Sequence, residues 1–221
     1  MTLILSLICT TFLVALGSAL VLTSIAETQI AASYDRAIEA LHAADGAAER
    51  ALADLSAIAD WSDVLDGSVQ SAFVDGAPGG TRVLADGVVL DLTRTTNRVR
   101  CGRDGCTSAD LDASTAERPW GANNPRWQLF AYGPLQALLP PGSIRSQMYV
   151  VVWAGDDADE QDGRPLVDGD PNADGSANAG RDVLVLLAHA YGPAGVRRMV
   201  EMTIARGTGG PRLLAWREIR Q

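Results

Sequence analysis

The residues best suited to bind a ligand are acidic and lie late in the chain, after an acidic run from Asp156 to Asp162. Asp170, Asn172 and Asp174, with the glycine that follows, take the first, third, fifth and sixth positions of an EF-hand-like calcium loop. Alternating oxygen ligands around a tight glycine turn suit a hard cation such as Ca²⁺. The twelfth position is an arginine instead of a bidentate glutamate, and Asp182 is the nearest carboxylate. The pattern predicts either a calcium site formed by Asp170, Asn172, Asp174 and Asp182 or a solvated acidic loop between two strands.

Cys101 and Cys106 flank a short turn with a glycine at each end. A disulfide between them is expected if this part of the chain lies outside the cytoplasm. A zinc site is the alternative, but it needs two further ligands. His42 and His189 are single and far apart in the sequence, which disfavours zinc. Cys9 lies in an apolar run and is expected to behave as a small hydrophobe.

The sequence lacks the motifs of common enzyme active sites. It has no G-x-S-x-G, no H-E-x-x-H, no lysine for a P-loop and no G-x-G-x-x-G after a strand. We expect His42 on the polar side of a helix and His189 in an alternating strand, and neither placement indicates catalysis. The net charge of −9 also argues against nucleic-acid binding, which needs a basic patch to neutralise phosphates. We therefore expect a non-enzymatic protein with no cofactor other than Ca²⁺ at the acidic loop.

The element that organises the chain is its first 26 residues. From Leu3 to Ala26 there is no charged residue and no proline. As a helix with about 1.5 Å of rise per residue, this run spans roughly 36 Å, enough to cross a hydrocarbon core of about 30 Å. A cleaved signal peptide would have a shorter apolar core. The absence of basic residues before the run suggests that a charged leader preceded Met1.

Residues 27–59 continue the helix with amphipathic spacing. Apolar residues recur at intervals of three and four, with charged residues on the other faces. The apolar positions are Ile30, Tyr34, Ile38, Leu41, Ala44, Ala48, Leu52 and Leu55. We expect one unbroken helix of about 55 residues, with residues 1–26 in an apolar environment and residues 27–59 against a globular domain.

Residues 60–221 are expected to form that domain, rich in β-structure. Trp61, Val64 and Leu65 are expected to pack the helix end against it. Runs of β-branched and aromatic residues predict strands joined by short turns, and hence an antiparallel sheet and an α+β fold. The expected strands are Trp127–Tyr132, Gln147–Ala154, Val183–Tyr191, Val196–Arg206 and Leu213–Ile219, after a hairpin around Asp86–Gly87 and an extended stretch at Asn97–Cys101. Trp120, Trp127 and Trp153 are expected in the core, although an exposed partner surface is the alternative.

Several of these segments resemble a known family. Met1-Thr2-Leu3-Ile4 looks like the start of a mature type IV pilin, and segments Thr23–Tyr34 and Glu39–Leu52 are similar to the PilX-type pilus assembly proteins. The resemblance covers about the first 55 residues. It implies a pilin-like fold, in which a long membrane-spanning helix packs on an antiparallel sheet. It also implies cleavage and methylation at Met1 by a prepilin peptidase.

The same resemblance implies a function and a place. The chain would be a minor subunit of a type IV pilus, held in the inner membrane with its domain outside the cytoplasm and then moved to the cell-surface filament. Its partners would be the lipid bilayer, the inner-membrane assembly machinery and other pilins, met through Leu3, Ile4, Leu5 and Gly17. Major pilins have glutamate at the fifth position, so Leu5 favours a priming or tip role. The alternatives are a secretion pseudopilin and a membrane-tethered binding module or adhesin with a calcium loop.

Overall fold

The computed structural model describes residues 1–116, 126–140, 142–143, 145–157, 159–160, 162–169 and 180–220. The chain divides into two units, Met1–Glu39 (unit 1) and Ala40–Gln221 (unit 2). Helix α1 (Thr2–Leu55) contributes its first part to unit 1 and its last part to unit 2. The division follows the contacts of the chain, because the helix begins to bury side chains at Ala40.

The prediction of one long N-terminal helix is confirmed. It ends at Leu55, a turn earlier than expected, and Ile30 and Tyr34 of the expected apolar stripe are 69% and 66% exposed. Within unit 2 the buried face of α1 is narrow and almost entirely alanine. Its members are Ala40, Ala43, Ala44, Ala47, Ala48 and Ala51, each at most 1% exposed, with Leu55 completing the face.

The alanine face packs on a five-stranded antiparallel sheet of order β3-β4-β5-β6-β7. The strands are β3 (Gln128–Pro134), β4 (Tyr149–Asp156), β5 (Val183–Tyr191), β6 (Arg197–Gly207) and β7 (Gly210–Ile219). Short 3₁₀ turns at Leu135–Ala137 and Pro193–Gly195 follow β3 and β5. The predicted strands and their antiparallel pairing are therefore confirmed, and the fold is α+β.

Residues of the sheet alternate between two buried faces. Val150 and Val152 of β4 join the alanines of α1 in one core cluster, whereas Val151 and Trp153 join a second cluster on the opposite face. Because both faces are covered, all eight residues of β4 are buried. The core placement expected for Trp153 and Trp127 is confirmed, and Trp120 lies outside the described residues.

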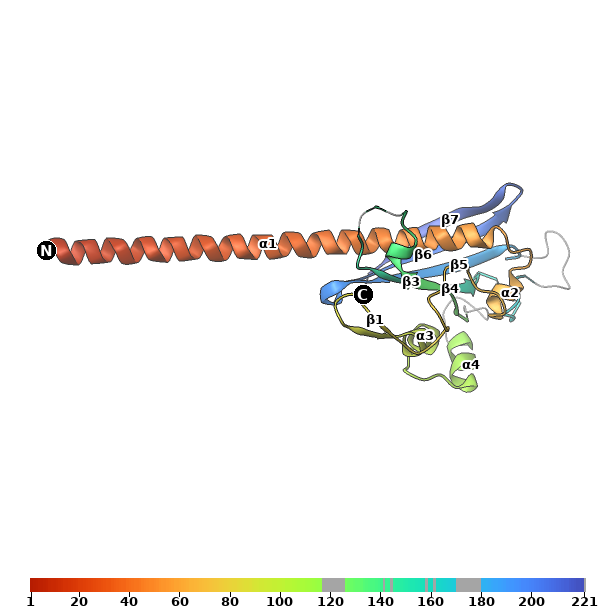
Figure 1. Ribbon diagram of the computed structural model, residues 1–221. Coiled ribbons are helices and arrows are strands. Elements are labelled where there is room, and N and C mark those ends of the chain that lie inside the picture. The colour runs from red at the N-terminus through yellow and green to blue at the C-terminus, as the bar shows by residue number, and fades with distance from the viewer. Residues whose placement is uncertain are drawn as a thin grey trace. The chain divides into compact units, whose positions relative to one another are not determined.

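The second face is covered by a small layer made from residues 81–116. It contains the hairpin β1 (Thr81–Val83) and β2 (Val89–Asp91), then α3 (Leu92–Cys101) and α4 (Ser108–Ala116). Figure 1 shows the unit 2 part of α1 on one side of the sheet and this layer on the other. The hairpin around Asp86–Gly87 was predicted correctly.

The prediction of an extended stretch at Asn97–Cys101 is wrong, because these residues belong to the helix α3. Both ends of this helix are capped. The Asp91 side chain accepts a hydrogen bond from the Arg94 amide at 2.9 Å, and Gly102 closes the other end with φ of +74°. An N-cap aspartate and a left-handed glycine stabilise a helix even where valine and threonine disfavour it.

Trp61 closes the end of α1. Its buried indole N–H donates to the Leu55 carbonyl at 3.2 Å, one of the carbonyls that a helix end leaves unpaired. Arg206 of β6 lies over the indole ring, with its guanidinium carbon 4.4 Å from the ring centroid. Trp61, Val64 and Leu65 are all buried, as predicted, and α2 (Ser62–Leu65) carries the last two.

The two edges of the sheet differ. Segment Ser71–Asp75 runs along β3 and donates hydrogen bonds to its carbonyls at 3.0 and 2.9 Å. At the other edge, β7 has Pro211 near its start, and a register shift leaves Leu214 as a bulge. Most of β7 is exposed.

Substitution of an alanine on the packed face tests this helix–sheet contact. We expect Ala44→Leu to lower the free energy of unfolding by roughly 1–3 kcal/mol, because extra methylenes in a filled core force side chains and backbone apart. Ala53→Leu, at an exposed position of the same helix, should change it by less than about 0.5 kcal/mol. Urea denaturation of the full chain in detergent, followed by tryptophan fluorescence, measures both. Equal stabilities for the two variants would contradict close packing of the alanine face.

Candidate functional site

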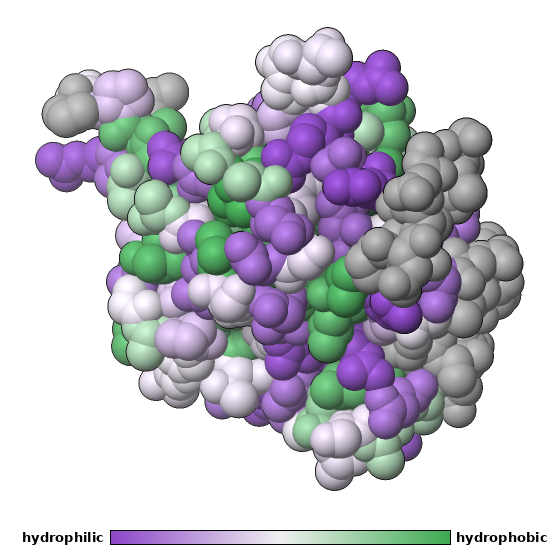
Figure 2. All heavy atoms as spheres, turned by 90° about the vertical axis from the view of Figure 1, so that its right-hand side faces the viewer, coloured by the Kyte–Doolittle hydropathy of each residue, from purple (hydrophilic) through white to green (hydrophobic). Residues whose placement is uncertain are grey.

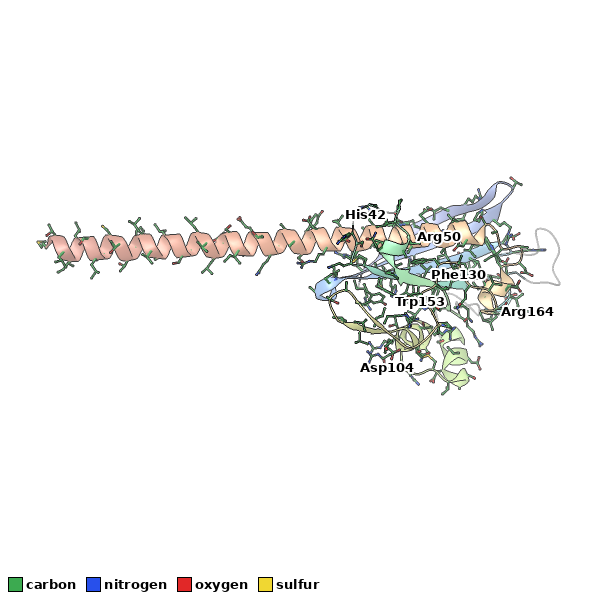
Figure 3. The ribbon with its side chains drawn as sticks, viewed as in Figure 1. His42, Arg50, Asp104, Phe130, Trp153 and Arg164 are labelled. Atoms are coloured by element: carbon green, nitrogen blue, oxygen red, sulfur yellow. A yellow bond between two sulfur atoms is a disulfide. The ribbon has the colours of Figure 1, made fainter. Side chains whose placement is uncertain are left out.

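The first candidate site is the apolar part of α1 in unit 1. Every residue from Met1 to Ala31 is exposed, and Leu3, Ile4 and Leu5 are 80%, 65% and 67% exposed. Figure 3 shows side chains leaving this part of the helix on all sides. Among the described residues, α1 is the one helix long and apolar enough to cross a membrane. An apolar surface of this extent calls for a cover of lipid or of other helices.

Five hydroxyl groups of this segment are satisfied within the helix itself. Ser6, Thr10, Thr11, Ser18 and Thr23 each donate to a carbonyl three or four residues earlier, at 2.8 to 3.0 Å. Their polar hydrogens need no partner from outside. The segment is therefore compatible with a hydrocarbon environment, where an unsatisfied polar group costs several kcal/mol.

The structure places the predicted assembly residues together on this segment. Met1 directly precedes α1, Leu3, Ile4 and Leu5 lie in its first turn, and all four residues are exposed. At Gly17 an added Cβ would meet nothing within 4 Å, so no contact inside the chain requires glycine there. Glycine in a helix costs roughly 0.5–1 kcal/mol relative to alanine. A close neighbour outside the chain is one reason for a glycine that the chain itself does not need.

The predicted disulfide is formed. Cys101 and Cys106 are bonded, with their Cα atoms 6.1 Å apart. The bridge joins the last residue of α3 to the segment that leads into α4, and it closes the turn that begins at Gly102. Cys9 is free and exposed in unit 1, and not buried within the chain.

The predicted calcium loop is described only at its end. Asp170, Asn172 and Asp174 lie outside the described residues. Asp182 makes an ion pair with Arg206 at 2.9 Å, and its amide donates to the Asp168 carboxylate at 2.7 Å. Asp182 thus fixes the start of β5 against β6.

Buried carboxylates gather where β4 ends, close to Asp182 in the fold. Asp156 is 0% and Glu160 2% exposed. Burial, together with the charge of Glu160, raises the pKa of Asp156 to about 9. Burial also raises the pKa of Glu160 to about 8, with Asp162 and Asp168 adding to the effect. Asp168 itself has its pKa raised to about 6, mainly by burial.

These carboxylates were not identified as buried from the sequence, where Asp156–Asp162 has the composition of a solvated loop. The available signal was that Asp156 directly continues a strand of β-branched residues. Within the described ranges, no three acidic, histidine or cysteine side chains are placed so that they could hold one metal ion. The described part of the acidic segment is therefore a group of buried carboxylates with raised pKa values. Carboxylates in such surroundings are stabilised by taking up a proton or by a nearby cation. The calcium prediction stays a prediction.

Comparisons with protein-family models, with curated proteins and with solved structures found no match.

The buried carboxylates predict how stability depends on pH. Their pKa values in the folded chain, about 6 to 9, lie above the value of about 4 that they have when unfolded. Between these limits the folded chain binds more protons than the unfolded chain, so the free energy of unfolding falls as pH rises. We expect a lower Tm at pH 9 than at pH 6 in the presence of a chelator, by several degrees, since 1 kcal/mol is worth about 2–4 °C in a chain of this size.

Two variants test whether the buried carboxylates cause this pH dependence of stability. Asp156→Asn combined with Glu160→Gln should flatten the pH dependence, because amides of the same shape do not titrate. Asp63→Asn, at an exposed position, should leave the slope unchanged. A double variant that keeps the slope of the unmodified chain would show that the buried carboxylates do not cause it.

Proposed function

We propose that this chain is a non-enzymatic structural subunit of a pilin-like filament, anchored in the inner membrane by residues 1–26. The observation that carries the proposal is the two-part character of α1. Residues 3–26 of α1 are an exposed, uncharged apolar stretch, and the part of α1 from Ala40 onward packs through alanines on an antiparallel sheet. The N-terminal motifs that resemble PilX-type pilus assembly proteins give the proposal its family.

The proposed mechanism is an exchange of one apolar environment for another. The segment first lies in lipid and then among the N-terminal helices of neighbouring subunits in the filament. Because the hydroxyls of Ser6, Thr10, Thr11, Ser18 and Thr23 bond within the helix, neither environment has to supply these groups with partners. Ala15, Gly17, Ser18 and Ala19 provide a small-residue stretch along which another helix can approach closely.

Leu5 refines the role to a minor subunit. In major pilins the resemblance implies a glutamate at this position, which pairs with the N-terminal amine of a neighbour during assembly. A carboxylate in such an apolar place is costly and is kept where it has a partner. A subunit with Leu5 has no such requirement, which suits a priming or tip position. A pseudopilin of a type II secretion system is the alternative within the same class.

The disulfide supports an extracytoplasmic position for unit 2. Structural disulfides persist in oxidising compartments and are rare in the cytosol. Cys101–Cys106 therefore agrees with a single-pass protein whose C-terminal domain is exported. The partners would be the lipid bilayer, the inner-membrane assembly machinery, a prepilin peptidase and other pilins.

Mass spectrometry of the N-terminus tests the proposal. The protein would be purified from sheared surface filaments and from membranes, and the intact mass and N-terminal peptide compared between the two fractions. We expect a methylated Met1 at the mature terminus in the filament fraction. An unmodified or formylated Met1, found only in membranes, would reject the filament subunit and leave a membrane-tethered domain.

A calcium-binding module is the second candidate, favoured by the buried carboxylates of Asp156 and Glu160, which precede the acidic loop in the sequence. A ligand that binds only the folded chain stabilises it, by about 2.7 kcal/mol at 100 times its Kd. At pH 8, about 10 mM Ca²⁺ exceeds the roughly 10⁻⁴–10⁻³ M Kd of extracellular calcium modules and should raise the Tm. Asp170→Asn combined with Asp174→Asn should abolish the rise, with Asp63→Asn as the control. A Tm insensitive to Ca²⁺ would remove this candidate.

A further inference from the structure

A cavity of about 470 Å³ lies on the second face of the sheet. Its walls come from β2, α3 and the neighbouring strands β5 and β6, with Ile219 of β7 at one side. All of these elements belong to unit 2. The volume falls within the range of about 300–1,000 Å³ that is usual for sites that bind small molecules.

The wall of the cavity is mixed, and its apolar part comes from both sides. Leu90 and Val99 contribute from the covering layer, and Leu187, Met199 and Ile219 contribute from the sheet. The apolar body of an organic ligand placed there would remove these side chains from water, which favours binding. Apolar walls with a few fixed polar groups are typical of small-molecule sites.

The charged groups of the wall are mainly arginines. Arg94, Arg98 and Arg197 line the cavity in a chain whose net charge is −9. The two acidic residues of the wall already have other partners: Asp91 caps α3, and Glu201 pairs with Arg217 at 2.5 Å. The carboxylates therefore do not neutralise all of the arginine charge.

The three arginines differ in the hydrogen bonds and ion pairs that they make within the chain. Arg98 pairs with Asp104 at 2.6 Å. Arg197 hydrogen-bonds to the Tyr191 phenol oxygen, which opposes the effect of burial on that phenol. In the part of the chain that the structure describes, the Arg94 guanidinium has neither a hydrogen bond nor an ion pair. Arg94 is thus a cation at the cavity wall with all five of its N–H donors free.

His189 adds a buried donor to the same wall. Its side chain is about 95% buried, and its Nδ1 lies 3.0 Å from the Tyr191 hydroxyl oxygen. Burial, with the charge of Arg197 adding to it, lowers the pKa of His189 to about 3, whereas burial raises the pKa of Tyr191 to about 12. The imidazole is therefore neutral and the phenol protonated at neutral pH.

We assign His189 the tautomer in which the Tyr191 phenol donates to Nδ1 and Nε2 carries the imidazole proton. The hydrogen bond from Arg197 to the phenol oxygen is compatible with this arrangement. Nε2 is buried and has no hydrogen-bond partner in the described structure. A buried donor without a partner loses its hydrogen bonds to water and gains none in exchange, which destabilises the fold. Such a cost is commonly tolerated where a ligand supplies the missing acceptor.

We infer that this cavity binds a small organic anion, a carboxylate group on an apolar body. The guanidinium groups of Arg94 and Arg197 match a carboxylate in charge and planar geometry, and the Nε2–H of His189 offers it a neutral donor. The apolar body lies against Met199 and its neighbours on the sheet. This site is independent of the filament role proposed above, because none of its residues belongs to unit 1.

Binding of 2-naphthoate by the full chain in an uncharged detergent, with 2-naphthamide as the uncharged analogue, tests the inference. Isothermal titration calorimetry, corrected with protein-free micelles, measures both. We expect one site that binds the carboxylate at least tenfold more tightly than the amide. Equal affinities for the two probes would overturn the inference.

Substitutions assign the binding to the cavity. Arg94→Gln should weaken 2-naphthoate binding at least tenfold and leave 2-naphthamide unchanged, and it removes no internal contact on which folding depends. Arg212→Gln, at an exposed position of β7, is the matched control and should change neither affinity. An unchanged 2-naphthoate affinity in Arg94→Gln would overturn the inference.

His189→Phe gives a readout that separates ligand binding from folding. The ring volume is retained while the unpaired donor is removed, so we expect a higher Tm without ligand together with weaker 2-naphthoate binding. Weaker binding with a lower Tm would mean that His189 is needed for the fold and would remove it from the site. Unchanged binding would have the same consequence.

Discussion

The contact on which the rest of this structure depends is the one between the alanine face of α1 and the sheet. Six alanines bring the helix backbone close to the strands, so a helix that is apolar and exposed over its first part becomes a well-packed core element over its last part. Trp61 and Arg206 then close the helix end, which fixes where the chain leaves the core. Once one face of the sheet is occupied in this way, the remaining chain can cover only the other face. The layer of β1, β2, α3 and α4 does so.

Periodicity and side-chain type were sufficient to predict the parts of the fold that are locally encoded. The run of valines in β4 and the hairpin of β5 and β6 are strand signals that tertiary packing did not override. Helix α3 was missed because its threonines and its valine favour strands over helices. The caps at Asp91 and Gly102 stabilise the helix in spite of these residues. The buried state of Asp156 was missed because it depends on the turn that covers the strand end, and the local sequence is that of a solvated loop.

The cavity could not be predicted from the sequence. Arg94 and Arg197 are separated by about a hundred residues, and only the packing of α3 over β5 and β6 brings them to one wall. His189 was assigned correctly to a strand, but its unpaired Nε2 is a property of its neighbours in space. The apolar segment, unlike the cavity, could be predicted from the sequence, because the lack of charged residues from Leu3 to Ala26 depends on composition alone. On the face of unit 2 shown in Figure 2, by contrast, hydrophilic and hydrophobic residues are interleaved.

The structure of the two sheet edges affects whether copies of this chain aggregate at high concentration. A row of unpaired backbone N–H and C=O groups is a template on which a second chain can add as a strand. Here one edge is occupied by Ser71–Asp75, and the other has a proline that lacks an N–H and a bulge at Leu214 that disrupts a regular ladder. Growth of a cross-β aggregate from either edge is therefore disfavoured. At high local concentration the β domains of separate copies are therefore not templated to join edge to edge.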